Sequence, residues 1–288
     1  MIKGGISEPY VPFDQKGSVD YSRLKGAINW LQDRGVKGFM VNGIGAEALV
    51  LTVQERKRVL ESVIDVAKSK NEISVVITSY HPDSIIELAK HAKDAGASYA
   101  VITQHPIYPV KKPVDYLKEI ASKSPLPLIL YNERQLGNLL TPAQVVSLLK
   151  QDEFAGYKDS TKDIGHLQEV VDEFPEKSTL LAGSDSLIYT TYTLGGKGIV
   201  SLIINVFPKL VLDLVKSMEE NDMKKGLELQ IKINRVRGLL KSYGFSAGYR
   251  EAAKLAGNDF GNTFNRSEEL SEQEIKDLEQ KLKKEKMI

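Results

Sequence analysis

Short apolar runs alternate with amphipathic stretches along most of the chain. Several runs are apolar at consecutive positions, such as Val75-Val76-Ile77 and Leu128-Ile129-Leu130, which is typical of strands covered on both faces of a parallel sheet. We predict eight strands from this pattern, and they cover residues 6–9, 38–42, 73–78, 98–103, 126–131, 154–158, 179–182 and 198–203.

Helical signals lie between these strands. Thr52 and Glu55 have the spacing of a capping box, and Thr141-Pro142 places an N-cap before a proline in the first helical turn. Seven of the eight predicted strands are followed by a helical segment, which predicts an α/β fold of the (β/α)8 TIM-barrel type. An open, doubly wound sheet is the alternative, because the pattern does not show whether the sheet closes.

The last part of the chain is wholly helical in pattern. We predict helices over residues 208–219 and 223–240, a third that begins near Ser246, and a final one over 271–285. No linker, repeat or low-complexity tract separates this part from the rest. The predicted organisation is therefore a barrel over residues 1–207 and a helical extension over 208–288 that packs on the barrel.

Composition narrows the chemistry. The chain has no cysteine, which excludes disulfides, thiolate catalysis and cysteine metal sites, and its four scattered histidines do not indicate a metal centre. A net charge of +1 does not indicate a nucleic-acid surface. The N-terminus lacks the apolar stretch of a signal peptide, and no later run is long enough to span a membrane. We therefore expect a cytoplasmic protein that binds neither nucleic acid nor membrane.

Lys158 is the first candidate for chemistry. The active site of such a barrel lies at the carboxyl ends of the strands, and Lys158 ends the predicted strand over 154–158. Desolvation among the barrel walls lowers the pKa of a lysine, and a neutral amine can attack a ketone to form an imine. The alternative is a lysine paired with Asp159, and position alone favours that alternative.

Three more strand ends carry candidate groups. Tyr131 offers a phenol that can shuttle a proton, or a large side chain that only caps the barrel core. The turn Gly43-Ile44-Gly45 offers backbone N–H groups that can hold a carboxylate, although a plain tight turn has the same sequence. In Gly183-Ser184-Asp185, polar side chains can bind hydroxyls of a sugar-like substrate, or cap the helix that begins near Leu187.

These motifs together resemble a known family. Gly156-Tyr157-Lys158-Asp159-Ser160 is similar to the G-x-K-D-[ST] signature of the dihydrodipicolinate synthase and N-acetylneuraminate lyase superfamily. Leu130-Tyr131-Asn132 resembles the signature of its fifth strand, and Val41-Asn42-Gly43 with Glu47 resembles its second-strand region. The match runs in order from residue 4 to about residue 215, and the ordered set is more specific than any one motif.

The resemblance implies a homotetramer, built as a dimer of dimers, and a class I lyase that needs no cofactor. Pyruvate would form an imine on Lys158, Tyr131 would relay protons, and the turn Gly43-Ile44-Gly45 would face the pyruvate carboxylate. Val200 would stand where the family uses a backbone carbonyl near the bound pyruvate. Gly183-Ser184-Asp185 is similar to the loop that meets the hydroxylated end of the sugar acid in archaeal 2-keto-3-deoxygluconate aldolases.

The chain also departs from the family. Ile44 and Gly45 replace a hydroxyl pair that holds the carboxylate and completes the proton relay. Ile107 stands in place of a tyrosine that crosses the subunit interface, and the adjacent Tyr108 is the candidate replacement. The arginine that dihydrodipicolinate synthases use for the aldehyde substrate's carboxylate is absent, and Arg134 is shifted from its position.

Imine formation does not require the groups that are missing here. The sequence therefore predicts a carbon–carbon lyase that reversibly cleaves a 2-keto acid, of the 2-keto-3-deoxy sugar acid type, to pyruvate and an aldehyde. One alternative is 4-hydroxy-tetrahydrodipicolinate synthase, which condenses pyruvate with aspartate semialdehyde. The other is a non-catalytic homologue that binds a 2-keto acid.

Overall fold

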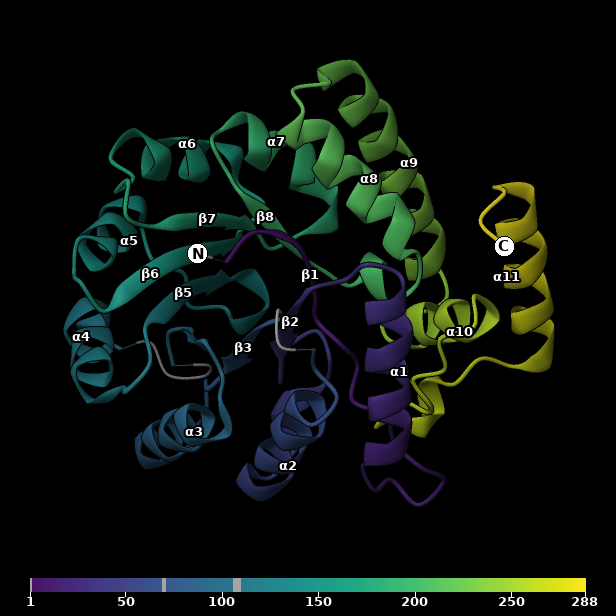
Figure 1. Ribbon diagram of the computed structural model, residues 1–288, viewed down its shortest axis with the longest axis horizontal. Helices are drawn as coiled ribbons and strands as arrows, with labels where there is room; N and C mark the ends of the chain where they lie inside the picture. Colours follow the sequence, from purple (N-terminus) through teal and green to yellow (C-terminus); the bar gives the residue numbers. More distant parts are fainter. Residues whose placement is uncertain (1, 69–70, 106–109) are drawn as a thin grey trace.

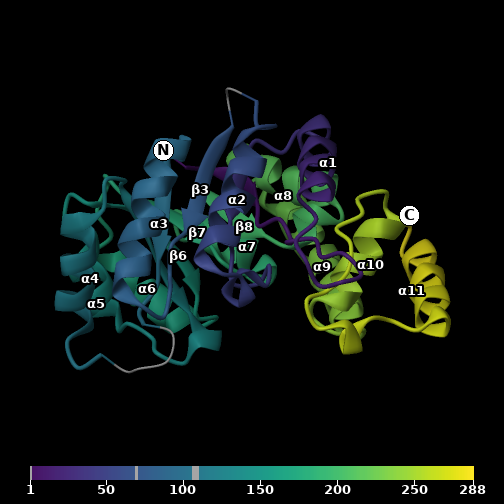
Figure 2. The same cartoon turned by 90° about the horizontal axis from the view of Figure 1, so that it is seen from below.

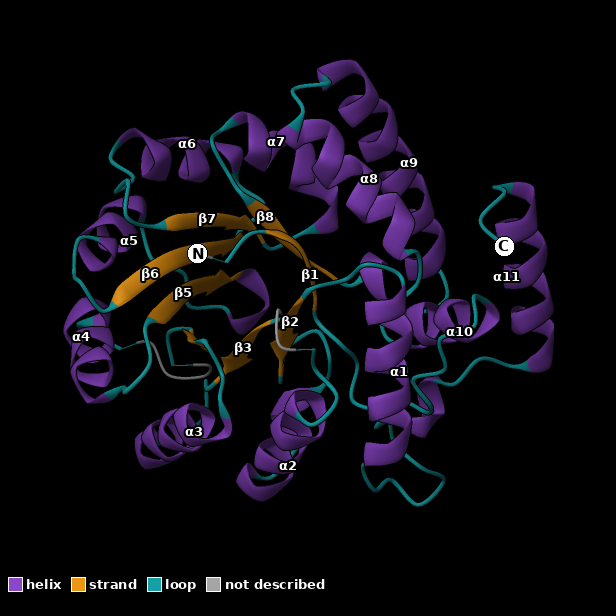
Figure 3. Ribbon diagram, viewed as in Figure 1, coloured by secondary structure: helices purple, strands orange, loops and turns teal. Residues whose placement is uncertain are grey.

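The strands form a closed barrel. The structure is a computed structural model that describes residues 2–68, 71–105 and 110–288. The parallel strands pair in chain order, and the last closes on the first, with Gly4 opposite Gly198 and Ser7 opposite Ser201. The (β/α)8 prediction is thus confirmed over an open sheet (Figure 1, Figure 3). The strands are β1 (Gly4–Ser7), β2 (Gly38–Val41), β3 (Glu72–Val76), β4 (Tyr99–Ile102), β5 (Leu128–Glu133), β6 (Phe154–Ser160), β7 (Thr179–Ala182) and β8 (Gly198–Ser201).

The helices surround the barrel and continue beyond it. They are α1 (Tyr21–Asp33), α2 (Val53–Ile64), α3 (Pro82–Ala95), α4 (Pro113–Lys123), α5 (Pro142–Leu149), α6 (Ile164–Asp172), α7 (Ile188–Thr193), α8 (Pro208–Glu219), α9 (Met223–Lys241), α10 (Ala247–Leu255) and α11 (Glu272–Lys284). The predicted capping box at Thr52 is confirmed, and Thr141 caps α5 in the same way. Each such cap stabilises its helix by roughly 1 kcal/mol.

Strand ends differ from the prediction where hydrogen bonding, not hydrophobicity, sets them. The apolar pattern extended the first strand to Pro9, but β1 ends at Ser7. Proline has no N–H to donate to a ladder, so Pro9 cannot continue the pairing as other residues do. In the opposite sense β6 runs past Lys158 to Ser160, because β5 continues to Glu133 and pairs with it.

A small apolar core fills the barrel, separate from the large core between barrel and helices. Tyr131 on β5 lies directly opposite Lys158 on β6, so the two side chains project from the same face of the sheet. Tyr131 belongs to the inner core, which places both side chains on the barrel interior. The buried members of the inner core are Ile2, Ile6, Met40, Val76, Val101, Ile129, Tyr131, Leu181 and Val200.

The C-terminal helices follow the predicted pattern. Helix α8 has the predicted bounds, and it packs against β1 and α9. Helices α10 and α11 extend beyond α1, on the opposite side of the molecule from α4 and α5 (Figure 1, Figure 2). The boundary at residue 208 stays a prediction, since α8 joins the ring of helices around the barrel. Within the described residues, none of the helices combines the length and the apolar character needed to cross a bilayer.

Candidate active site

Lys158 is held inside the barrel by three groups. Its side chain is 1% exposed, and Nζ donates a hydrogen bond to Glu8 Oε2 at 3.0 Å. Nζ also lies 3.7 Å from Met40 Sδ and 3.9 Å from the ring centroid of Tyr131. The nitrogen is therefore enclosed by a carboxylate, a thioether and an aromatic face at the carboxyl ends of the strands.

Asp159 is not the partner of Lys158. Successive side chains on a strand point to opposite faces, so Asp159 faces the helices while Lys158 faces the interior. The Asp159 carboxylate accepts hydrogen bonds from Tyr157 Oη at 2.8 Å and from Thr161 Oγ1 at 2.9 Å. Burial raises the pKa of Asp159 above its usual range. The simple pairing of Lys158 with its neighbour, which position alone favoured, is wrong.

Glu8 fits against the turn Gly43-Ile44-Gly45. Its buried carboxyl group occupies the space that side chains would fill at the two glycines. A Cβ at Gly43 would overlap Cγ and Cδ of Glu8, and a Cβ at Gly45 would lie 3.0 Å from Oε1. Within the described residues, the N–H groups of this turn donate no hydrogen bond. The open N–H groups therefore line the same space as the carboxylate.

Tyr131 has a carboxylate acceptor on its own strand. Its hydroxyl donates a hydrogen bond to Glu133. Burial raises the pKa of Tyr131 well above its usual value, and the nearby carboxylates of Glu133 and Glu8 raise it further. The phenol is therefore protonated at neutral pH. It can donate its proton to a substrate, but a second group must then supply a proton to the phenolate.

A cavity of about 60 Å³ lies beside these groups. The predicted residues Gly45, Tyr131, Gly183, Ser184, Asp185 and Val200 line it, together with Glu8 and Glu133. Lys158 does not line it and lies buried beside Glu8 and Tyr131, while Ile44 is half-buried against the inner core. Tyr108 and Ile107, expected near a subunit interface, lie outside the described residues.

The loop after β7 does not form the helix cap that was expected from the sequence at Ser184 or Asp185. Ser184 occupies the N-cap position of the short 3₁₀ segment Asp185–Leu187, but its side chain makes no capping bond there and contacts Ser186 Oγ at 2.9 Å. Asp185 accepts hydrogen bonds from the Ser201 hydroxyl and from the backbone N–H of Leu202. The predicted helix cap is wrong, because the Asp185 carboxylate instead fixes the turn after β8.

Several residues of the site escaped sequence analysis. Glu8 was included in an apolar run, although a carboxylate at the end of a barrel strand was a usable signal. Glu133 follows Tyr131-Asn132 directly and was not considered as a site residue. Three cations also line the cavity, and two of them come from a helix distant in sequence. They are Lys162 after β6 and Arg237 and Lys241 on α9.

The three cations, which we call the positive rim, line the cavity together with the carboxylates of Glu8, Glu133 and Asp185. Burial lowers the pKa of Lys241, and the charges of Arg237 and Lys162 lower it further. Lys162 also adopts a left-handed backbone conformation with φ of 60°, which is uncommon for a residue other than glycine. Like charges held this close repel one another, so the rim favours an anionic ligand that separates and screens them.

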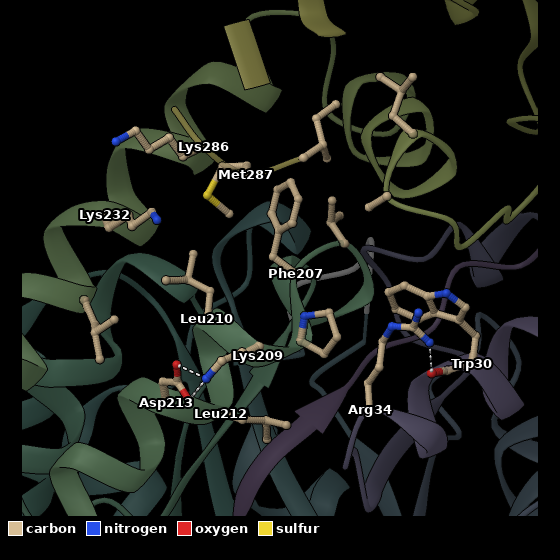
Figure 4. A pocket seen from close by; sticks show the side chains of 16 residues that line it. Trp30, Arg34, Phe207, Lys209, Leu210, Leu212, Asp213, Lys232, Lys286 and Met287 are labelled. Carbon is tan, nitrogen blue, oxygen red and sulfur yellow. Dashed lines mark hydrogen bonds and ion pairs between the residues drawn. The ribbon is translucent and has the colours of Figure 1, made fainter. Parts of the chain in front are cut away.

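A larger cleft lies elsewhere and does not mark the chemistry. It has a volume of about 920 Å³ and opens between α1, α8 and the C-terminal tail (Figure 4). Arg34 stacks on Trp30 at its edge, with the guanidinium carbon 3.7 Å from the ring centroid. None of the predicted site residues that the structure describes lines this cleft. Size alone would therefore have pointed to the wrong place.

The chain resembles known proteins over nearly its whole length. The family model of the dihydrodipicolinate synthetase family matches residues 1–285. A DapA-like lyase of Halobacterium salinarum, itself uncharacterised, is 31% identical over 89% of this chain and 86% of its own length. The 4-hydroxy-tetrahydrodipicolinate synthase of Methanocaldococcus jannaschii is 30% identical over 81% of each chain. A chloride-inhibited dihydrodipicolinate synthase from Acinetobacter baumannii, solved with pyruvate, has a TM-score of 0.91 at 27% identity over 100% of each chain.

These comparisons decide the family and the reaction class. The resemblance predicted from the ordered motifs is confirmed by the family match over almost every residue. The prediction of an enzyme that acts on carbon–carbon bonds is confirmed by the same match and by the relatives. The chain therefore belongs to the dihydrodipicolinate synthetase family, and it is a carbon–carbon lyase of the pyruvate-dependent aldolase type.

Proposed function

We propose that the enzyme is a class I aldolase that reversibly cleaves a 2-keto-3-deoxy sugar acid to pyruvate and an aldehyde. The observation that carries the proposal is the buried amine of Lys158, which lies among Glu8, Met40 and the Tyr131 ring at the catalytic end of the barrel. A lysine excluded from water is suited to form an imine with a ketone. The imine then withdraws electrons from the carbon–carbon bond that breaks.

Each remaining role follows from a position in the site. In the proposal Tyr131 exchanges protons with the substrate, and the open N–H groups of Gly43-Ile44-Gly45 bind the substrate carboxylate. The backbone of Val200 lies against the pyruvate part. Ser184 and Asp185, which line the cavity, contact hydroxyls of the substrate. Because the Asp185 carboxylate already accepts three hydrogen bonds, Ser184 is the more available partner.

The size of the cavity limits how the substrate binds. A space of about 60 Å³ holds only part of a sugar acid. The reacting ketone must reach Lys158 past Glu8 and Tyr131, so binding requires these side chains to move. We expect the hydroxylated end to stay near Ser184, at the positive rim of Arg237, Lys241 and Lys162.

The direct test is a cleavage assay over a panel of 2-keto-3-deoxy sugar acids of differing length and stereochemistry. Pyruvate release is followed with lactate dehydrogenase and NADH. We expect release from at least one substrate, and none from the same protein in which Lys158 is replaced by methionine. Absence of release across the panel, in protein that still forms an imine with pyruvate, would leave a 2-keto acid-binding homologue as the better hypothesis.

The alternative substrate is aspartate semialdehyde. It is favoured by the name of the 30% identical synthase of Methanocaldococcus jannaschii. It is disfavoured by Arg134, which is exposed and does not line the cavity, so it is not in place to bind the carboxylate of that aldehyde. A coupled assay with aspartate semialdehyde separates the two hypotheses, since a synthase would turn over this aldehyde faster than any sugar-derived one.

Replacing Arg237 with methionine is expected to raise KM about 10-fold with little change in kcat. The reason is that a cation at the rim attracts the anionic substrate before and after the chemical step alike. Added salt should raise the KM of the unmodified enzyme more than that of the variant. Arg235→Met is the matched control, because Arg235 lies on the same helix and pairs with Glu285 at 3.5 Å. An equal KM in both variants would count against the role of the rim.

Assembly and location belong to the same proposal. A homotetramer built as a dimer of dimers, and a cytoplasmic location, both stay predictions. Sedimentation of the full chain at micromolar and nanomolar concentrations measures the first directly. A monomer at every concentration would contradict it.

A further inference from the structure

Several contacts hold Glu8 in place beside Lys158. Its carboxylate lies 3.0 Å from Lys158 Nζ, and its side chain is 5% exposed. Asn205 Nδ2 donates to the Glu8 backbone oxygen at 2.7 Å, while Asn205 Oδ1 accepts from Ser7 Oγ at 2.6 Å. The Asn205 amide therefore holds the chain at both Ser7 and Glu8. The glycines of the turn, described above, provide the space for its side chain.

Stability does not explain such a pair. Removing two charges from water costs several kcal/mol per ion, and apolar replacements of buried ion pairs are often neutral or stabilising. Apolar side chains already fill the barrel below the pair. A carboxylate that touches the reacting nitrogen therefore points to chemistry.

We propose that Glu8 is the acid–base partner of Lys158 in imine formation. This inference rests on the proposed function and extends it, because it names a catalytic carboxylate at the end of β1. Ile44 and Gly45 provide no hydroxyl, and the Tyr131 phenol is bonded to Glu133. Among the described residues, Glu8 is the titratable group that contacts Nζ through a hydrogen bond.

The proton inventory of the step balances. One proton passes from Nζ to Glu8, which leaves a neutral amine and a neutral acid. The amine adds to the keto carbon, a C–N bond forms, and the former carbonyl oxygen takes the proton from Glu8. Glu8 then removes a proton from the nitrogen and delivers it to the hydroxyl, which leaves as water as the C=N bond forms. The protonated imine keeps one proton on nitrogen, and Glu8 ends as a carboxylate.

Substrate binding itself favours the first transfer. The proposed carboxylate site is the turn Gly43-Ile44-Gly45, against which Glu8 packs. Two carboxylates that share one buried site repel, and a proton on one of them removes the repulsion. Lys158 donates a hydrogen bond to Glu8, and the charge of Glu8 also acts on Tyr131 and Tyr10, whose pKa values are both raised mainly by burial. Lys158 is therefore the proton source.

The experiment measures the rate of imine formation, not turnover. Full-length protein is mixed with pyruvate, quenched with borohydride at successive times and weighed intact, over a series of acidic to alkaline pH values. For the unmodified protein we expect the rate to fall at acidic pH, because the step requires a carboxylate that accepts the proton of Nζ. Glu8→Gln should form the adduct about 100-fold more slowly near neutral pH and with a different pH profile, because the Lys158 ammonium must then lose its proton to water.

Two further variants separate catalysis from structure. Glu8→Asp keeps a carboxylate, but one that lies farther from Nζ because its side chain is shorter. It should therefore retain the acidic decline and lose less rate than Glu8→Gln. This variant also decides the question if Glu8→Gln does not fold. Asp159→Asn removes a buried carboxylate next to Lys158 in sequence but on the opposite face, and it should keep the pH profile.

The outcomes distinguish the two proposals. If Glu8→Gln forms the adduct at the unmodified rate and with the same pH profile, the role of Glu8 is overturned and imine chemistry on Lys158 stands. If the unmodified protein forms no adduct at any pH, the proposed function itself fails. A pH profile that is unchanged in Glu8→Gln but altered in Asp159→Asn would overturn the role of Glu8 and assign the proton transfer to Asp159.

Discussion

Replacing Lys158 with methionine is expected to abolish cleavage, with kcat below detection, and to lower the free energy of unfolding by about 3–5 kcal/mol. Activity is lost because no other group takes over an imine-forming amine. Stability is lost because Glu8 stays buried while its cationic partner is gone. Steady-state kinetics and urea unfolding at neutral pH measure the two effects separately.

The double variant Lys158→Met with Glu8→Gln is the control. It removes the uncompensated charge, so it should recover most of the lost stability while remaining inactive. A stability loss of the same size in the double variant would contradict the buried pair. Recovery of activity in either variant would contradict the role of Lys158.

Tyr131→Phe is expected to lower kcat by about 10³-fold with a small change in KM. The phenol exchanges protons with the substrate only as bonds break, so the chemical step suffers most. Phenylalanine keeps the ring on which Lys158 packs at 3.9 Å, so imine trapping with pyruvate should persist. Glu133 is half-exposed and regains water, so unfolding stability should change by about 1 kcal/mol or less.

Tyr157→Phe is the matched control for that prediction. Tyr157 is also a buried tyrosine, and it directly precedes Lys158 in the sequence. Its hydroxyl, however, lies outside the barrel interior, where it donates a hydrogen bond to Asp159 at 2.8 Å and lies 3.1 Å from His166 Nε2. This variant should lose stability and keep most of its kcat. If both variants lose kcat equally, the phenol of Tyr131 has no special role in proton transfer.

The fold was accessible from sequence because its determinants are local. Continuous apolar runs mark strands covered on both faces, and capping residues such as Thr52 mark helix starts. Closure of the sheet was not accessible from the pattern, since it depends on pairing between β1 and β8 at opposite ends of the barrel segment. Strand ends were misplaced where the partner strand decides them, as at Ser160 opposite Glu133.

The site was only half accessible. Lys158 and Tyr131 follow from the rule that barrel chemistry gathers at strand ends, and from an ordered set of motifs. Glu8 does not, because its meaning depends on space left by Gly43, which lies in a different loop. Arg237 is still more difficult to identify from the sequence, because the pattern of α9 indicates only a helix. Tertiary packing alone brings this residue to the cavity.

The central claim is that pyruvate forms an imine on Lys158 Nζ. Reduction with borohydride in the presence of saturating pyruvate, followed by peptide mass spectrometry, tests this claim most directly. The account predicts one reduced pyruvate adduct per chain, on Lys158, and none in Lys158→Met. Absence of an adduct, or an adduct on a different lysine that survives in Lys158→Met, would contradict it.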